Sequence, residues 1–293
     1  MRITQRAVAL TSLNGLNRNL DSLSRLQQQL TSGKQISSPS DSPTGVNRAM
    51  QTRSDQAAVE QQARNISDAK GWLEQTDSTL LTMVEQIRRV RDLTVQGLNG
   101  GSSAASEEAL ATEVASIREG LIALANTSVR GRPLFGGVTA TGKAYDPAGN
   151  WAGDASAPVM RRVSDTESIR IDITGPEAFG TAPDDLFSLV GRITTDLTAG
   201  VPAALSADLA DLDTVMEGML SAVADVGSRG TRIENLEQIN VDRALTLSSQ
   251  LATTEDIDMP ETIMRLQMAQ VGYQAALSAT SKAIQPTLLD YLR

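Results

Sequence analysis

Apolar residues recur at alternating steps of three and four along most of the 293-residue chain, the spacing of a helix face that packs on another helix. Near the amino end the repeat is formed by Leu13, Leu16, Leu20, Leu23 and Leu30, with Gln27 as a polar break. A helix stop follows, where Gly33 can take the left-handed conformation, and Pro39 and Pro43 prevent the helix from continuing. The pattern predicts an amino-terminal helix followed by a hinge.

A second repeat predicts a long helical rod over residues 45–98. Its positions are Ile66, Ala69, Leu73, Thr76, Leu80, Met83, Ile87, Val90 and Thr94. At 1.5 Å per residue such a helix is about 80 Å long, too long to bury itself against a small globule. After a short polar loop, Ser103 or Ser106 can cap a third helix. The short loop predicts that this third helix runs antiparallel to the rod.

The helical period disappears over residues 131–183, which contain eight Gly and five Pro. Two strands are predicted here, Ala157–Val163 and Ser168–Thr174, because isoleucines alternate with polar residues in the second of them. The sequence therefore predicts a small β-rich insertion.

Helical periodicity returns after Asp184, a candidate helix cap, and again after Pro202. The second rod carries Leu205, Leu209, Leu212, Met216, Met219, Val223, Val226 and Ile233. The last helix opens at Pro260 and carries Ile263, Leu266, Gln270, Tyr273, Leu277, Thr280 and Ile284. Pro286 ends it, and a short apolar tail with Leu288 and Leu289 follows.

We predict a mainly α fold, in which long antiparallel helical rods from both termini form a coiled-coil-like bundle and a small β-rich domain is inserted in the middle. The predicted parts are an amino-terminal helix (1–36), a rod in two parts (37–130 and 201–253), the β-rich domain (131–200) and a carboxyl-terminal helix (254–293). The simplest packing places the amino end beside the carboxyl end and the β-rich domain at the far tip.

Composition removes most catalytic chemistry. The chain contains no His and no Cys, so it cannot form a Ser-His-Asp or Cys-His site, the usual zinc and iron–sulfur sites, or a disulfide. Ser-Lys, paired-carboxylate and magnesium-dependent chemistry remain open. Aromatic residues make up only 3% of the chain, so the rods must pack almost wholly through aliphatic side chains. We expect no cofactor, no metal and no catalysis.

Two patterns resemble chemical motifs. The segment from Gly137 to Ala144, with Lys143, differs by one residue from a phosphate-binding loop, but the motif needs Ser or Thr at position 144 and a helix after it, and Pro147 follows instead. The carboxylate pairs Glu107/Glu108, Asp184/Asp185 and Glu255/Asp256 stand near predicted helix starts. The helix dipole explains such pairs without catalysis.

Charge is unevenly distributed. The net charge is -9, whereas residues 1–53 carry seven basic and two acidic side chains. An acidic protein with a mildly basic amino end is a poor nucleic-acid binder. No apolar run follows Arg2 and Arg6 that would make a secretory signal, and no window is apolar enough to span a membrane. We therefore expect neither nucleic acid nor membrane as a partner.

The heptads of the rods are explained by a self-contained helical bundle, but the terminal helices differ. Each lies outside a proline-marked hinge, and each has only the other as an intramolecular partner, a pair that would be marginal in water. We expect neighbouring subunits to complete their stripes. The predicted assembly residues are Leu13, Leu16, Leu20, Leu23, Leu30, Ile263, Leu266, Tyr273, Leu277, Ile284, Leu288 and Leu289.

Short motifs at both ends carry a resemblance. These are Arg2-Ile-Thr4, Leu30-Thr-Ser-Gly-Lys34, Pro39-Ser-Asp-Ser-Pro43, Gly131-Arg-Pro-Leu-Phe-Gly-Gly137, Val226-Gly-Ser-Arg229, Asp256-Ile-Asp258 and Leu288-Leu-Asp-Tyr-Leu292. Together they resemble the hook-associated junction proteins of the bacterial flagellin superfamily, over both terminal thirds of the chain. Pro133 and Gly136 depart from the usual residues of the turn into the β domain.

The resemblance implies a structural protein that connects hook-associated protein 1 on the hook side to the flagellin filament, with copies of itself in a ring. It implies export through the flagellar type III apparatus without a cleaved signal peptide, to an extracellular place at the hook–filament junction. A cytoplasmic export chaperone is implied to bind Ile263, Leu266, Tyr273 and Leu277. Two alternatives remain: a minor flagellin that itself forms the filament, and a nucleotide-using or carboxylate-based enzyme in the β insertion.

Overall fold

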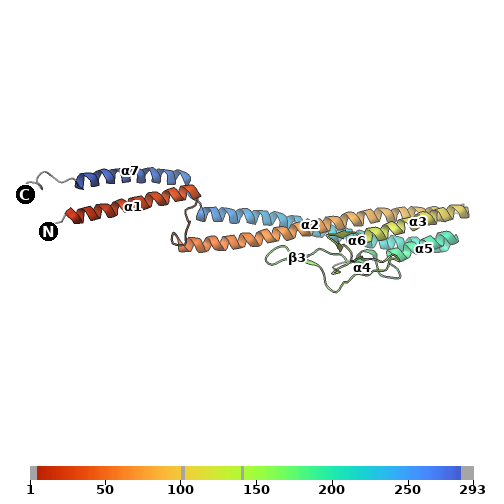
Figure 1. Cartoon of the computed structure of the whole chain (residues 1–293). Coiled ribbons are helices and arrows are strands. Elements are labelled where there is room, and N and C mark those ends of the chain that lie inside the picture. Colours follow the sequence, from red (N-terminus) through yellow and green to blue (C-terminus); the bar gives the residue numbers. More distant parts are fainter. Residues whose placement is uncertain (1–4, 100–102, 140–141, 285–293) are drawn as a thin grey trace, which may run out of the picture. The chain divides into compact units, whose positions relative to one another are not determined.

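The computed structural model describes residues 5–99, 103–139 and 142–284, and its contacts divide the chain into two compact units. Unit 1 consists of Met1–Ala58 and Ala244–Arg293, and unit 2 of Val59–Arg243. Two long helices, α2 (Pro43–Leu98) and α6 (Pro202–Glu255), contribute to both units (Figure 1). The mainly α fold with long helices is confirmed, and no described helix is long and apolar enough to cross a membrane.

The helical part of unit 2 is built on the predicted stripe of α2. All nine stripe residues are buried, with exposed fractions of at most 2%. Its two polar members do not break the seam, because Thr76 and Thr94 donate their hydroxyl groups to the backbone carbonyls of Trp72 and Val90, at 2.9 and 2.8 Å. The heptad pattern thus identified the core face of this helix, buried threonines included.

Two shorter helices complete the bundle of unit 2. They are α3 (Ala104–Ala125), which begins after Ser103, and α5 (Leu186–Ala199), and they pack against each other (Figure 1). Gly97 of α2 lies close to Leu110 of α3 and Leu197 of α5, so α3 returns along the rod as predicted. The cap of α5 is Asp185 and not Asp184, the predicted residue.

The β-rich insertion contains less sheet than predicted. Its strands are β1 (Ser128–Val129) paired with β2 (Arg132–Pro133), and β3 (Met160–Arg162) paired with β4 (Ser168–Arg170), both antiparallel. The predicted strands were too long because Asp172 turns inward: its carboxylate, 1% exposed, accepts the Val159 N–H at 2.8 Å. The side chain takes the place of a carbonyl of the ladder, and the pairing ends.

A short helix, α4 (Gly175–Phe179), follows β4 and was not predicted. It begins with a capping box in which Thr174 and Glu177 satisfy each other's backbone groups, and it has Pro176 in its first turn. The run Thr-Gly-Pro-Glu is a recognisable helix start, so the sequence contained the signal.

The scarce aromatic residues form the core of the insertion. Phe135, Tyr145, Phe179 and Phe187 pack with ring centroids 4.6–6.0 Å apart, mostly edge to face. Burial raises the pKa of Tyr145 well above its ordinary value. Aromatic side chains give an irregular chain with little sheet a compact core.

The insertion does not lie at the far tip of the rods, where it was expected. It packs alongside them, because Asn65 of α2 donates to the Arg162 carbonyl at 2.7 Å, and Arg232 and Arg243 of α6 form ion pairs with Glu167 and Asp165. Residue 65 lies about 50 Å before the end of α2 at 1.5 Å per residue. The cause is α3, which carries the chain back along the rod before the insertion begins.

Candidate assembly surfaces

The two terminal helices, α1 (Gln5–Ser32) and α7 (Met259–Ile284), pack side by side in unit 1 (Figure 1). One stripe on each helix is half-buried or buried. On α1 the apolar members are Leu16, Leu23, Leu26 and Leu30; on α7 the stripe is Thr262, Leu266, Ala269, Tyr273, Ala276 and Thr280. The steps of four and three along α7 place all six residues on one face, so the pair forms a single seam.

A pair of helices has only one seam, and the apolar residues outside it remain in solvent. Leu10, Leu13 and Leu20 of α1 are 47–55% exposed. On α7, Ile263 and Leu277 flank the seam and are both 43% exposed. Of the side chains described in these two helices, only Thr262 is buried. The described part of the pair therefore has no core of its own.

A third apolar strip lies on the face of α7 opposite the seam. Met264, Met268 and Val271 are 55%, 67% and 66% exposed. Their steps of four and three turn them by about half a helix turn from the seam residues Leu266 and Tyr273. We call Met264, Met268 and Val271 the outer strip. A helix that is apolar on several faces is typical of one enclosed by other helices.

The structure sorts the predicted assembly residues into two groups. Leu16, Leu23, Leu30, Leu266 and Tyr273 lie in the seam. Leu13, Leu20, Ile263 and Leu277 lie outside it and are exposed. The Ile284 side chain, Leu288 and Leu289 lie outside what the structure describes. Sequence reasoning missed Leu26, where it followed Gln27, and it missed the outer strip, whose second repeat along α7 could have revealed it.

The hinge below these helices is tied by backbone hydrogen bonds. Gly33 has φ of +70°, as its position after α1 requires. The Gln35 N–H donates to the Glu255 carbonyl at 2.6 Å, and the Ile257 N–H donates to the Gly33 carbonyl at 3.1 Å. Lys34 and Asp256 thus form an antiparallel bridge, which joins the segment after α1 to the segment after α6 within unit 1.

Glu255 is the charged centre of this hinge. It is the last residue of α6, not near a helix start as the sequence suggested, and the helix dipole disfavours a carboxylate there. Lys34 and Arg53 compensate, with ion pairs of 2.8 and 2.7 Å to a side chain only 5% exposed. Burial alone would raise the pKa of Glu255, but these two cations outweigh it and hold the pKa below its usual value.

The Pro-Ser-Asp-Ser-Pro segment forms the turn into α2. Asp41 accepts the backbone N–H groups of Ser37 and Ser38 at 3.1 and 2.9 Å, and these hydrogen bonds lower its pKa. Ser42 caps the helix by accepting the Gly45 N–H at 3.1 Å, and Pro43 occupies the first helical position. The motif that carried the resemblance therefore has a local structural role.

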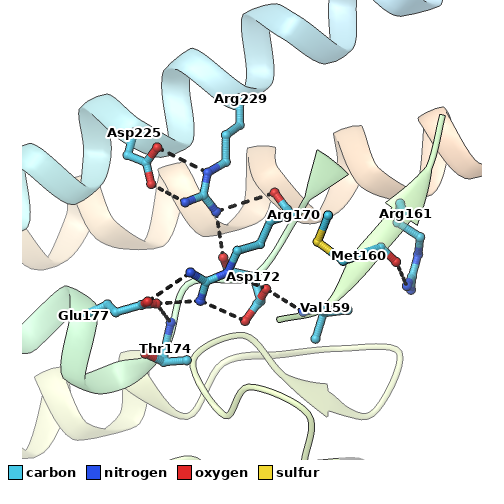
Figure 2. Close-up of polar contacts among 9 residues, drawn as sticks. All are labelled: Val159, Met160, Arg161, Arg170, Asp172, Thr174, Glu177, Asp225 and Arg229. Carbon is cyan, nitrogen blue, oxygen red and sulfur yellow. Dashed lines mark hydrogen bonds and ion pairs between the residues drawn. The ribbon is translucent and has the colours of Figure 1, made fainter. Parts of the chain in front are cut away.

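A network of charged side chains fastens the insertion to α6 (Figure 2). Arg229 of α6 pairs with Asp225 and donates to the Asp172 carbonyl at 2.8 Å, while Arg170 forms ion pairs with Asp172 at 3.0 Å and Glu177 at 2.7 Å. Burial of Glu177 opposes ionisation, yet hydrogen bonds from Arg170 and Thr174 lower its pKa to about 2. Every carboxylate in this network has a cation or backbone donor, which is typical of a structural clamp.

The segment that follows Lys143 does not have the structure of a P-loop. Lys143 is exposed, and turns rather than a helix follow it, with Asp146 accepting the Asn150 N–H at 2.8 Å. A P-loop requires a helix at this point. Within the residues that the structure describes, no three acidic side chains are placed to hold a metal ion.

Comparison with known proteins defines the class. The family model for the bacterial flagellin N-terminal helical region matches residues 3–140. The flagellar hook-associated protein 3 of Escherichia coli strain K12 is 26% identical over 306 residues, covering 95% of this chain and 96% of its own. The chain is therefore similar to proteins of the bacterial flagellin superfamily.

Two solved structures extend the likeness to the fold. A putative flagellar hook-associated protein from Vibrio parahaemolyticus has a TM-score of 0.68 at 19% identity, covering 74% of this chain and all of its own. FlgL of Bacillus cereus has a TM-score of 0.62 at 23% identity, covering 69% and 99%. The chain is a homologue of flagellar hook-associated protein 3, the hook–filament junction protein, which supports the sequence-based prediction over that of a minor flagellin.

Proposed function

We propose that this chain is a structural subunit of the bacterial flagellum at the junction between hook and filament. The observation that carries the proposal is the α1–α7 pair, whose apolar residues exceed what one seam can cover. Exposed Leu13, Leu20, Met268 and Val271 cost little when neighbouring helices enclose them. In a tube of helices, copies of this chain, hook-associated protein 1 on the hook side and flagellin on the filament side supply those neighbours.

The five predicted parts of the chain fit this role. The terminal helices (1–36 and 254–293) would serve assembly, the two rod segments (37–130 and 201–253) would form the surrounding shell, and the β-rich domain (131–200) would face outward. Its charged clamp and aromatic core hold it against the rod as a passive module. Such a protein acts outside the cell, and we propose export without a cleaved signal peptide.

An export chaperone that binds α7 must compete with α1. Ile263 and Leu277 are accessible in the folded chain, but Leu266 and Tyr273 lie in the seam. We therefore propose that the chaperone binds α7 before it packs on α1. Leu266→Asp with Leu277→Asp should abolish chaperone binding and filament attachment while unit 2 stays folded. Normal motility with this double variant would contradict the assignment of α7.

Immunogold labelling of the chain in its source bacterium tests the function directly. A single band at the hook–filament boundary is expected. Signal along the whole filament, together with polymerisation of the purified chain into long filaments, would favour the minor flagellin. Binding of magnesium-ATP to the full chain, lost in Lys143→Ala, would instead favour an enzyme in the insertion.

A further inference from the structure

Two arginines beside the hinge of unit 1 have no side-chain partner within the described residues. Arg25 of α1 and Arg48 of α2 are exposed, and within the described residues neither guanidinium has a hydrogen bond or an ion pair. Lys34 and Arg53, one hollow away, are both held by Glu255. The difference singles out Arg25 and Arg48 as unused cations at the hinge.

These two arginines line one hollow of about 470 Å³. Thr44 and Gly45, in the first turn of α2, also line it and add the positive end of a helix dipole. Asp41 is the acidic member of the lining, and its Oδ2 accepts hydrogen bonds from Ser37 and Ser38, so the two arginines still outnumber the carboxylate in the lining. The hollow therefore favours an incoming carboxylate.

The carboxylate of Asp256 lies near this hollow in the sequence and has no side-chain partner within the described residues. Thr253 and Thr254, on the last turn of α6, line the hollow, and Asp256 follows directly after that helix. The Asp256 side chain is exposed. Its neighbour Asp258 is occupied, because it accepts the Glu261 N–H at 3.0 Å.

We propose that Arg25 and Arg48 of one copy receive Asp256 of the next copy, so that the hinge is a copy-to-copy contact. The inference rests on the proposed function, which requires copies side by side. The arginine pair and Asp256 are different patches, so their contact between copies is a heterologous interface. Such an interface closes into a ring when the rotation between copies allows it. Exposed ion pairs add little affinity, so this contact fixes orientation and register while the apolar faces of α1 and α7 supply the binding energy.

Thiol cross-linking tests the contact cleanly because the chain has no native cysteine. Two differently tagged chains, Arg48→Cys and Asp256→Cys, are co-produced in cells that lack the wild-type copy. Isolated flagella are treated with a spacer-bearing bis-maleimide, because a direct disulfide needs Cα atoms within about 7 Å and an arginine spans more. The expected product is a dimer carrying both tags. Either variant alone should give none.

The matched control replaces Arg48→Cys by Arg64→Cys, an exposed arginine without an ion pair that lies about 24 Å further along α2 at 1.5 Å per residue. It should give at least tenfold less dimer. Incorporation of both chains without the mixed dimer would overturn the contact. In a separate strain that produces a tagged wild-type chain, absence of that chain from the junction would instead overturn the proposed function.

Charge reversal covers the case in which a cysteine variant fails to assemble. Arg25→Glu with Arg48→Glu should lower incorporation at least tenfold, and adding Asp256→Arg to that chain should restore at least half of it. Failure of the third substitution to restore incorporation, with the chain folded, would overturn the pairing of Asp256 with these two arginines.

Discussion

The outer strip of α7 offers the sharpest test of assembly, through Met268→Asp combined with Val271→Asp. These side chains are 67% and 66% exposed in the single chain. Full burial of such a side chain is worth roughly 1.5–3 kcal/mol, so about two thirds of that, roughly 1–2 kcal/mol each, is still to be gained on assembly. The double variant should therefore weaken assembly by about 2–4 kcal/mol, roughly 30- to 1,000-fold.

The stability of the purified single chain should hardly change in the same double variant. Exposed substitutions away from a core typically shift stability by less than about 0.5 kcal/mol, so the thermal midpoint of the purified chain should stay within about 2 °C. Incorporation into isolated flagella is measured by quantitative immunoblot, with Asn14→Asp combined with Asn17→Asp, at two exposed positions of α1, as the charge-matched control. Wild-type incorporation of the double variant would refute the enclosure of this strip. A large drop in thermal midpoint would show that the strip is already buried.

Three further predictions concern single chains. Glu255→Gln should destabilise unit 1 by about 1.5–3 kcal/mol at pH 7. Because the folded-state pKa of Glu255 lies below the usual value of 4.5, the stability difference between wild type and variant should shrink as the pH falls below 4.5. An unchanged difference at pH 3, measured by thermal unfolding, would contradict the ion pairs. Gly137→Ala should destabilise the folded chain, because the new Cβ would lie 2.1 Å from the Asp154 carbonyl oxygen and the residue has φ of +66°. A Cβ at Gly71 meets open space, so Gly71→Ala should stabilise α2 by about 0.5–1 kcal/mol. Denaturant titration of the two variants checks both signs. Hydrogen exchange of the dilute chain should show weak protection over α1 and α7 and strong protection over the rods, and strong protection of the terminal helices would contradict their dependence on neighbours.

Periodicity predicted the rods well because the buried face of a long helix follows directly from the spacing of its apolar residues. Each stripe position of α2 repeats the same geometry, so sequence spacing is enough to identify the buried face, including Thr76 and Thr94. The insertion was predicted poorly because its strands are two or three residues long, and because Asp172 leaves the ladder to take a backbone donor. A side chain that replaces a carbonyl leaves no periodic trace.

The assembly site was predicted in part. Leucine spacing identified α1 and α7 as the helices that matter, but it could not say which leucines face each other. Leu13 and Leu20 continue the same repeat as Leu16 and Leu23, and only packing placed them outside the seam. The role of Glu255 also came from packing, because Lys34 and Arg53 lie more than 200 residues before it.

Residue type and spacing along the chain were enough to identify the long helices, the buried face of the rods, the absence of His and Cys chemistry and the resemblance to flagellar junction proteins. Packing set the position of the β insertion beside the rod, the choice of seam between α1 and α7, and the pairing of charges at the hinge. These depend on segments distant in sequence, whose approach is set by the sum of many packing contacts. The unpaired Arg25, Arg48 and Asp256 belong to this second group, since a charge is unpaired only with respect to everything folded around it.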